Sequence, residues 1–313
     1  MKLKPYEIIE KVVSASELGL ALLERPPLAW LTFKLGSAAL FDHENLLNRG
    51  HRFGFQKMGS ATWTLPELRA QKYETQATLD FYRQLIDAKN KGTPVVWLDW
   101  PVPVEIVKGF DVAAFIPESF MAIANIVGTD GHVACLEAVE RQGIADDICA
   151  MDRITLGAYF LEQIPEPAAI IAVAHPCDAG RTTNQLLEYC SGAPTYTINT
   201  AYSKKDEDVL LYSKHLFGAI SFLEGVLGQK FNWERFEAMM AVLNEHNHYL
   251  NEITHMNKSI PSPGLAHSIQ NLWLSKIPNS GNPLILENSR RLYEIARSRI
   301  KNPEKRRKVE KFR

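Results

Sequence analysis

The stretch AAIIAVAHPCDAGRTTNQLLEYCSG, residues 168–192, decides the fold because it joins the clearest strand of the sequence to a helix. The apolar run 168–175 has the length and composition of a buried strand. The residues that follow have helical spacing up to Gly192, and a glycine commonly ends a helix. Cys177 therefore stands where a strand ends and a helix begins, a place where reactive and metal-binding groups often lie.

The same alternation continues on both sides of this stretch. Short apolar or β-branched runs predict further strands, and segments with helical periodicity lie between them. The predicted strands are 94–100, 111–117, 168–175 and 193–200, and the predicted helical stretches are 102–110, 131–143, 148–164 and 177–192. Strands that alternate with helices favour an α/β fold, here a Rossmann-like, doubly wound parallel sheet.

Helical segments flank the predicted sheet at both ends of the sequence. Residues 1–90 hold an apolar stretch that Pro26 and Pro27 interrupt and then a long helix that ends at Gly92. Further helices are predicted at 206–228, 232–258, 261–276 and 287–302. We therefore divide the chain into a helical N-terminal segment, a Rossmann-like domain and a helical C-terminal segment, at 1–90, 91–204 and 205–313.

The composition is that of a globular protein, with 46% hydrophobic and 23% charged residues in a chain of 313. A formal net charge of −1 gives no case for a nucleic acid or a membrane surface as partner. No apolar run approaches the roughly 20 residues that cross a bilayer, and the charged, amphipathic start is unlike a signal peptide. We therefore expect a cytoplasmic protein without a nucleic-acid or membrane partner.

The four cysteines are too few and too scattered for a disulfide framework, so we expect free thiols or metal ligands. Cys149 and Cys177 each begin a predicted helix, and the positive end of a helix stabilises a thiolate, the form that holds iron. The fold could bring both thiols to one crevice at the edge of the sheet. The alternative is that both are small, buried apolar side chains. Simple packing explains Cys135 and Cys190, which lie within predicted helices.

Three further features bear on chemistry. His175 could donate a hydrogen bond to a substrate carbonyl or a cluster sulfur, or it could be a satisfied interior histidine. Arg153 could bind a substrate phosphate or pair with Asp146 or Asp147.

The motifs GxGxxG, GxxxxGKS/T, GxSxG and HExxH are absent from the sequence, which argues against the usual nucleotide loops, serine hydrolysis and zinc proteolysis. A doubly wound enzyme in which His175 activates Cys177 as a nucleophile is a further hypothesis.

The segment DDICAMDRITLGAYFLEQIPEPAAIIAVAHPCD, residues 146–178, resembles the central block of the 2-hydroxyacyl-CoA dehydratase and benzoyl-CoA reductase family. In that family a cysteine begins a helix that contains an arginine and a glycine, and a later strand ends in a Cys-Asp pair. Residues 94–119 are similar to the family's segment in which a strand meets a proline, a glutamate and a glycine. The matching positions are Cys149, Arg153, Gly157, 164–167, Cys177, Asp178, Pro103, Glu105 and Gly109. The resemblance extends over residues 85–300.

The resemblance implies that Cys149 and Cys177 hold a [4Fe-4S] cluster, with His175 and Glu105 as the candidate catalytic residues. It also implies that two such subunits, identical or different, form the catalytic component of an enzyme of anaerobic metabolism. A separate ATP-dependent iron–sulfur activator protein supplies one electron. That electron reduces an acyl-CoA substrate to a ketyl radical anion, which expels the 2-hydroxyl group. In the benzoyl-CoA reductase relatives, the electrons go to an aromatic ring instead.

The sequence departs from the family pattern in one respect. Family members usually run longer, with a second Rossmann-like domain and a third cluster cysteine near the end, whereas no cysteine follows Cys190 here. We therefore expect residues 205–313 to lead to a missing second domain, and a dimer partner to supply the missing ligand. The alternative to a cluster-bearing subunit is a non-catalytic scaffold or interaction subunit of the same family that has lost the cluster.

Overall fold

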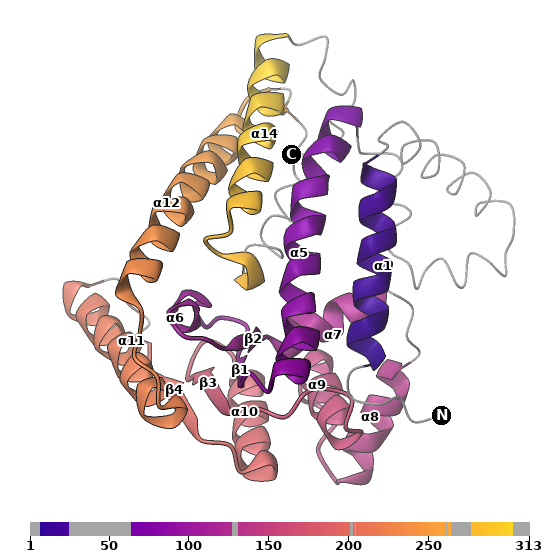
Figure 1. Ribbon diagram of the computed structural model, residues 1–313, viewed down its shortest axis with the longest axis vertical. Coiled ribbons are helices and arrows are strands. Elements are labelled where there is room, and N and C mark those ends of the chain that lie inside the picture. Colours follow the sequence, from indigo (N-terminus) through magenta and orange to yellow (C-terminus); the bar gives the residue numbers. More distant parts are fainter. Residues whose placement is uncertain are drawn as a thin grey trace, which may run out of the picture. The chain divides into compact units, whose positions relative to one another are not determined.

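The structure is a computed structural model (Figure 1), and its elements keep the labels of that figure. It divides into two compact units, one made of residues 1–13 and 82–236 and the other of residues 14–81 and 237–313. The three-part division of the sequence stays a prediction. The residues that the structure describes are 7–24, 64–126, 131–200, 203, 205–260, 262–263 and 277–302.

The first unit is built on a parallel sheet of four strands in the order β2-β1-β3-β4. The strands β1, β2 and β3 are buried along their whole length, as strands covered on both faces are. Their bounds are Val95–Leu98 for β1, Ala113–Phe115 for β2, Ala169–Val173 for β3 and Thr195–Ile198 for β4. These strands confirm the four predicted from the sequence and the mixed α/β class, whereas the Rossmann-like winding stays a prediction.

The helices of this unit form two groups. The helices α6 and α11 contact each other, and α9 contacts α7, α8 and α10 (Figure 1). Their bounds are Glu105–Lys108 for α6, Pro117–Ile126 for α7, Gly131–Arg141 for α8, Ala150–Phe160 for α9, Asp178–Ser191 for α10 and Asp206–Leu227 for α11. Sequence analysis missed α7. Its start follows directly on a strand, and Pro117 at its first turn is favourable there because the proline needs no N–H partner.

Trp97 anchors the core of the sheet from the middle of β1. Its indole Nε1 donates a hydrogen bond to the Pro165 carbonyl at 3.0 Å, so its buried polar atom is satisfied. Its ring centroid lies 5.9 Å from those of Phe115 and Tyr159. The tryptophan thereby connects β1 to β2, to α9 and to the proline-rich segment that precedes β3.

The second unit is helical. The α5 and α14 helices pack with α12 around the apolar residues Ala70, Ile253, Leu292 and Ala296. The unit contains α1 (Glu7–Leu23) from Ser14 onward, α5 (Leu65–Lys91) as far as Phe81 and α12 (Trp233–Met256) from Glu237 onward. It also contains all of α14 (Pro283–Lys301). The predicted helix at 261–276 and most of the Pro26–Pro27 stretch lie outside the described residues. Among the helices that the structure describes, none is long and apolar enough to cross a membrane.

A buried ion pair fixes two helices of this unit. Arg299 of α14 and Glu67 of α5 lie 3.1 Å apart, and their side chains are only 7% and 1% exposed. The guanidinium also donates to the Pro263 carbonyl at 2.8 Å and to the Thr64 hydroxyl at 3.1 Å. Because its hydrogen bonds are satisfied, the charge of Arg299 is tolerated inside the unit.

Gly157, one of the positions that carry the family resemblance, lies where α9 crosses α8. A β-carbon at this position would overlap the backbone carbonyl group of Cys135 in α8. The absence of a side chain therefore allows the two helix backbones to approach closely. Gly225 of α11 is different, since a β-carbon there would meet no atom within 4 Å.

We expect the Gly157→Ala variant to lose about 1–3 kcal/mol of unfolding free energy, because the added methyl group would push α8 and α9 apart. The matched variant Gly225→Ala should gain up to about 1 kcal/mol, because alanine has the higher helix propensity. Urea denaturation followed by circular dichroism measures both. Equal effects of the two substitutions would contradict the close approach of α8 and α9.

Candidate functional site

The candidate site lies at the carboxyl ends of β1 and β3, which are neighbours in the sheet. The strand order changes direction here, because β2 lies on one side of β1 whereas β3 and β4 lie on the other. Ligands of open parallel sheets commonly bind at such a point. Asp99 directly follows β1, and the segment 174–177 directly follows β3.

Cys177 is the N-cap residue of α10. Its Sγ accepts a hydrogen bond from the backbone N–H of Gly180 at 3.3 Å, and the residue is exposed. The preceding peptide bond, between His175 and Pro176, is cis. A sulfur held at the positive end of a 14-residue helix is placed to carry negative charge.

Cys149 is the N-cap residue of α9 and is also exposed. Its side chain is hydrogen-bonded to the carboxyl group of Asp152, in the first turn of the same helix. A β-carbon at Gly180 would lie 3.8 Å from Asp152 Oδ1 and 3.7 Å from the Cys177 sulfur. Asp152 and Cys177 therefore both lie next to Gly180, and the structure brings Cys149 and Cys177 to the same edge of the sheet.

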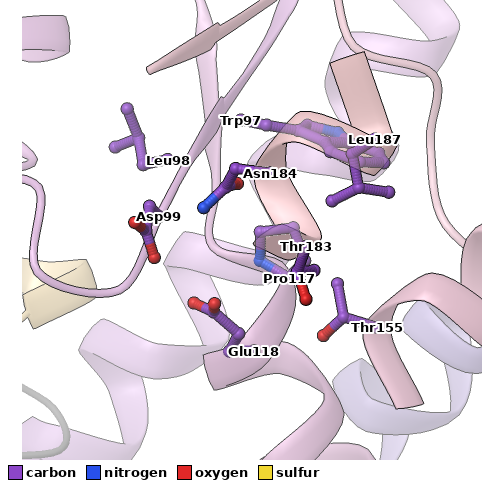
Figure 2. A pocket seen from close by; sticks show the side chains of 9 residues that line it. All are labelled: Trp97, Leu98, Asp99, Pro117, Glu118, Thr155, Thr183, Asn184 and Leu187. Atoms are coloured by element: carbon purple, nitrogen blue, oxygen red, sulfur yellow. The ribbon is translucent and has the colours of Figure 1, made fainter. Parts of the chain in front are cut away.

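Asp99, which is buried, and Glu118, which is half-buried, form a carboxyl pair at the same edge of the sheet. Their side chains are hydrogen-bonded to each other, and Figure 2 shows the Glu118 carboxyl turned toward that of Asp99. Burial raises the pKa of Asp99 to about 6, against the lowering effect of the Val173 N–H that it accepts at 3.2 Å. Burial and the charge of Asp99 hold the pKa of Glu118 well above its ordinary value.

The three carboxyl groups were missed by the sequence analysis. Burial also raises the pKa of Asp152, although its hydrogen bond with Cys149 works in the opposite direction. The signal was present: Asp99 is a carboxylate directly after the VVWL strand, and Asp152 stands three positions after a candidate ligand. Glu118 could not be placed, because the helix that carries it was not predicted.

The two predicted catalytic residues, His175 and Glu105, lie in different segments of the first unit. His175 is half-buried in the segment between β3 and α10. Glu105 lies in the first turn of α6. Burial lowers the pKa of Lys108, and the charge of Glu105 offsets part of that shift. Burial raises the pKa of Tyr212, and the charge of Glu105 adds to that increase. Their catalytic roles stay a prediction.

Arg153 forms an ion pair within the protein, as the second of its two interpretations predicts, but its partner differs from the predicted one. Its Nη2 lies 2.7 Å from Glu140 Oε1 of α8. The guanidinium reaches Asp146 only at the backbone carbonyl, at 3.4 Å. The pairing with an Asp146 or Asp147 carboxylate was therefore wrong, because α8 packs closely against α9 and offers the nearer carboxylate.

The remaining two cysteines lie away from this pair. Cys135 is fully buried in α8, with its Sγ 3.5 Å from Gln163 Oε1, and burial raises the pKa of its thiol to about 12. Cys190 is exposed near the end of α10. At a rise of about 1.5 Å per residue, the helix separates it from Cys177 by about 20 Å. Cys190 therefore does not replace a third ligand beside Cys177.

A groove of about 200 Å³ opens next to the Cys177 segment, between α10 and the strands β3 and β4. Small residues and threonines form its floor, and polar side chains of α10 form its wall. Its lining is Ala172, Val173, Ala174, Arg181, Asn184, Gln185, Glu188, Thr195 and Thr197. Arg181 places a positive charge in the first turn of α10, and Glu188 places a negative charge in its last turn.

The donor set fits part of an iron–sulfur site. Two exposed sulfurs at the amino ends of adjacent helices suit iron, which prefers thiolate ligands. Within the described ranges, however, no group of three or more histidine, cysteine, aspartate or glutamate side chains is arranged to hold a metal ion. This unit therefore presents two thiol ligands, and further ligands would have to come from elsewhere.

Comparison with known proteins gives one family match and several similar chains. The family model described as 2-hydroxyglutaryl-CoA dehydratase, D-component, matches residues 99–313. The (R)-2-hydroxyisocaproyl-CoA dehydratase alpha subunit of Clostridioides difficile is 27% identical over 53% of this chain and 42% of its own length. The (R)-phenyllactyl-CoA dehydratase alpha subunit of Clostridium sporogenes is 25% identical over 57% and 46%.

A third similar chain is the lactoyl-CoA dehydratase subunit alpha of Anaerotignum propionicum, with 24% identity over 56% of this chain and 47% of its own length. The chain thus spans under half the length of these three curated relatives. Both exposed cysteines of the candidate site lie within the residues that the family model matches.

We expect the native protein to react with iodoacetamide at Cys149, Cys177 and Cys190 and to leave Cys135 unmodified. The first three thiols are exposed, whereas Cys135 is buried and burial raises its pKa. Mass spectrometry of tryptic peptides measures the modified fraction at each position. Modification of Cys135 at the rate of the others, with the fold intact, would contradict the packing of α8 against α9.

Proposed function

Because the chain belongs to the 2-hydroxyglutaryl-CoA dehydratase D-component family, we propose that it is an iron–sulfur subunit of a 2-hydroxyacyl-CoA dehydratase. The observation that supports this most is that Cys149 and Cys177, both exposed, each begin a helix at the carboxyl edge of the sheet. The three similar chains are all named dehydratases, which favours dehydration over reduction of an aromatic acyl-CoA.

In this proposal Cys149 and Cys177 are two ligands of a [4Fe-4S] cluster. Such a cluster supplies a low-potential electron and an iron atom that can act as a Lewis acid. The two sulfurs lie at the amino ends of α9 and α10, the ends of a helix that favour a negatively charged ligand set, and Asp152 lies in the first turn of α9. We propose that His175, two residues before Cys177, donates a hydrogen bond to the substrate's thioester carbonyl or hydroxyl group.

The groove beside α10 supports an acyl-CoA substrate. It opens next to Cys177, and its volume of about 200 Å³ suits an acyl chain or part of the pantetheine arm. Arg181 lines it with a guanidinium that can attract the phosphate groups of coenzyme A. We propose that the thioester enters along this groove with its reacting end toward Cys177.

Partner proteins are part of the proposal. The similar chains are each named as one subunit of an enzyme, so we propose a second family subunit, with an ATP-dependent iron–sulfur activator protein as the electron donor. Exposed apolar side chains on α11 offer a surface for such contacts, since large apolar side chains in water commonly mark an interface. These side chains are Val209, Leu210, Leu211, Phe217 and Val226.

A non-catalytic subunit of the same family is the second candidate function. The observation that favours it is the ligand count: of the four cysteines, Cys135 is buried, Cys190 lies far along α10, and only two remain at the site. Such a subunit would keep the fold and bind a longer partner without holding iron itself.

We expect the Cys149→Ser and Cys177→Ser variants to lose the iron that the wild-type chain carries after anaerobic purification with its partner subunit. Serine keeps the size of the side chain but removes the thiolate that iron prefers. Iron and acid-labile sulfide analysis, together with the visible absorption spectrum, measures the loss.

The Cys190→Ser variant is the matched control, because it removes an exposed thiol of the same unit and should keep full iron content. Wild-type protein without iron, purified anaerobically with its partner, would favour the non-catalytic subunit. Full iron content in both Cys149→Ser and Cys177→Ser would contradict their assignment as ligands.

We expect the Arg181→Glu variant to bind a CoA thioester about three- to tenfold more weakly, because charge reversal at an exposed site changes the interaction by about 1 kcal/mol. Isothermal titration calorimetry measures the dissociation constant. Arg141→Glu, on α8 and away from the groove lining, is the control for a change in net charge. An equal loss in both variants would show that net charge, and not the groove, is responsible.

A further inference from the structure

The pair of Asp99 and Glu118 has no role in the proposed function, although Asp99 is hydrogen-bonded to the strand that ends four residues before Cys177. We propose that Asp99 and Glu118 share one proton at neutral pH and thereby act as positioning residues that fix the end of β3 and the segment 174–177. The inference rests on the proposed function in one respect: the proposed function makes Cys177 an iron ligand, so the position of the segment 174–177 matters for it.

Asp99 joins the ends of two strands with both its backbone and its side chain. Its N–H donates to the Ile171 carbonyl at 3.0 Å, and its Oδ2 accepts from the Val173 N–H at 3.2 Å. Val173 is the last residue of β3, four positions before Cys177. The carboxyl group of Asp99 therefore holds the point from which the cysteine segment departs.

Glu118 joins the same point to the start of α7. Its Oε2 accepts from the Trp100 N–H at 2.9 Å, so it fixes the residue that follows Asp99. Its carboxyl group is also hydrogen-bonded to that of Asp99. With both contacts made, the end of β1, the end of β3 and the start of α7 form one hydrogen-bonded group.

A shared proton is what the contact between the two carboxyl groups requires. Two ionised carboxylates at hydrogen-bond distance repel each other strongly, most of all where little water can screen them. Asp99 is only 6% exposed. Each carboxyl group accepts a backbone N–H with one oxygen. The hydrogen bond between them raises the pKa of Glu118 and lowers that of Asp99, so Glu118 is the donor and Asp99 the acceptor.

Among the residues that the structure describes, those that line the cavity beside the pair supply no compensating positive charge. From α9 the pair faces the carboxyl group of Asp152, which adds negative charge. The other residues that line the adjoining cavity of about 10 Å³ are uncharged. They are Trp97, Leu98, Pro117, Thr155, Thr183, Asn184 and Leu187 (Figure 2).

Thr155 gives an independent indication that the cavity is a polar site. Its side chain is 1% exposed, its hydroxyl makes no hydrogen bond to protein, and Figure 2 shows it turned into the cavity. The volume is that of a single water molecule. A water molecule bound there would join the Thr155 hydroxyl to the carboxyl pair and would complete the network.

The sign of the pH dependence follows from the raised pKa of Glu118. The folded protein keeps the Glu118 proton to a higher pH than the unfolded chain does. The free energy of unfolding therefore falls as the pH rises from the ordinary range of a glutamic acid through the raised value in the folded state. Above that value both carboxylates are charged, and the contact between β1, β3 and α7 loosens.

The test compares Glu118→Gln with Glu118→Ala in the metal-free, full-length chain. Glutamine has the shape of a protonated glutamic acid, so it can donate to Asp99 and accept from Trp100 at every pH. Relative to wild type, Glu118→Gln should melt at the same temperature near about pH 5 and several degrees higher near about pH 9. Glu137→Gln, an exposed carboxylate of α8, is the control and should show no such trend.

Hydrogen exchange of the peptide 173–181 tests the positioning role at the same two pH values, after correction for the intrinsic rate. The wild-type peptide should lose protection at high pH, Glu118→Gln should keep it, and Glu118→Ala should lose it at both. A pH-independent gap in melting temperature, or loss of protection in Glu118→Gln equal to that in Glu118→Ala, would overturn the shared proton. Unchanged exchange in Glu118→Ala would overturn the positioning role. Because no iron is present, none of these outcomes depends on the iron content of the cysteine variants.

Discussion

The pairing of β1 with β3 is the constraint on which the rest of the first unit depends. The two strands are separated by 70 residues of sequence, yet they are neighbours in register, with Val96 opposite Ala169 and Leu98 opposite Ile171. This register places Asp99 beside the end of β3, and it sets where α9 and α10 begin relative to the sheet. A shift by one residue would turn the side chains of β1 to the opposite face and would move the carboxyl pair out of contact.

Much of this architecture could be predicted from the sequence because its local signals agree with the fold. The runs VVWL and AIIAV have the apolar composition of strands covered on both faces. The helix that follows AIIAV ends at Gly192, a glycine with positive φ. The helix at Pro117–Ile126 escaped prediction because it follows a strand without a polar linker. Local periodicity shows where a helix turns its apolar face, but it gives weak evidence on where a strand stops and a helix starts.

The candidate site was predictable in its thiols and not in its carboxyl groups. Cys149 and Cys177 attract attention because each stands at a helix start and because the surrounding residues resemble a known family. The Asp99–Glu118 contact depends on two segments whose proximity no spacing reveals, since the residues meet only after the sheet has formed. The partner of Arg153 was misassigned for the same reason, because Glu140 comes from another helix. Interactions within one helix can be read from the sequence, whereas those between helices need the packing.

The cap of α10 has a consequence for the choice of amino acid at position 177. Serine, threonine, aspartate and asparagine are the side chains that best satisfy the free N–H groups of a helix start, and their oxygen atoms accept more strongly than a thiol does. A sequence selected for the stability of this helix alone would carry one of them at this position. The helix instead begins with a weaker acceptor, so the chain gives up some local stability in order to keep sulfur at this edge of the sheet.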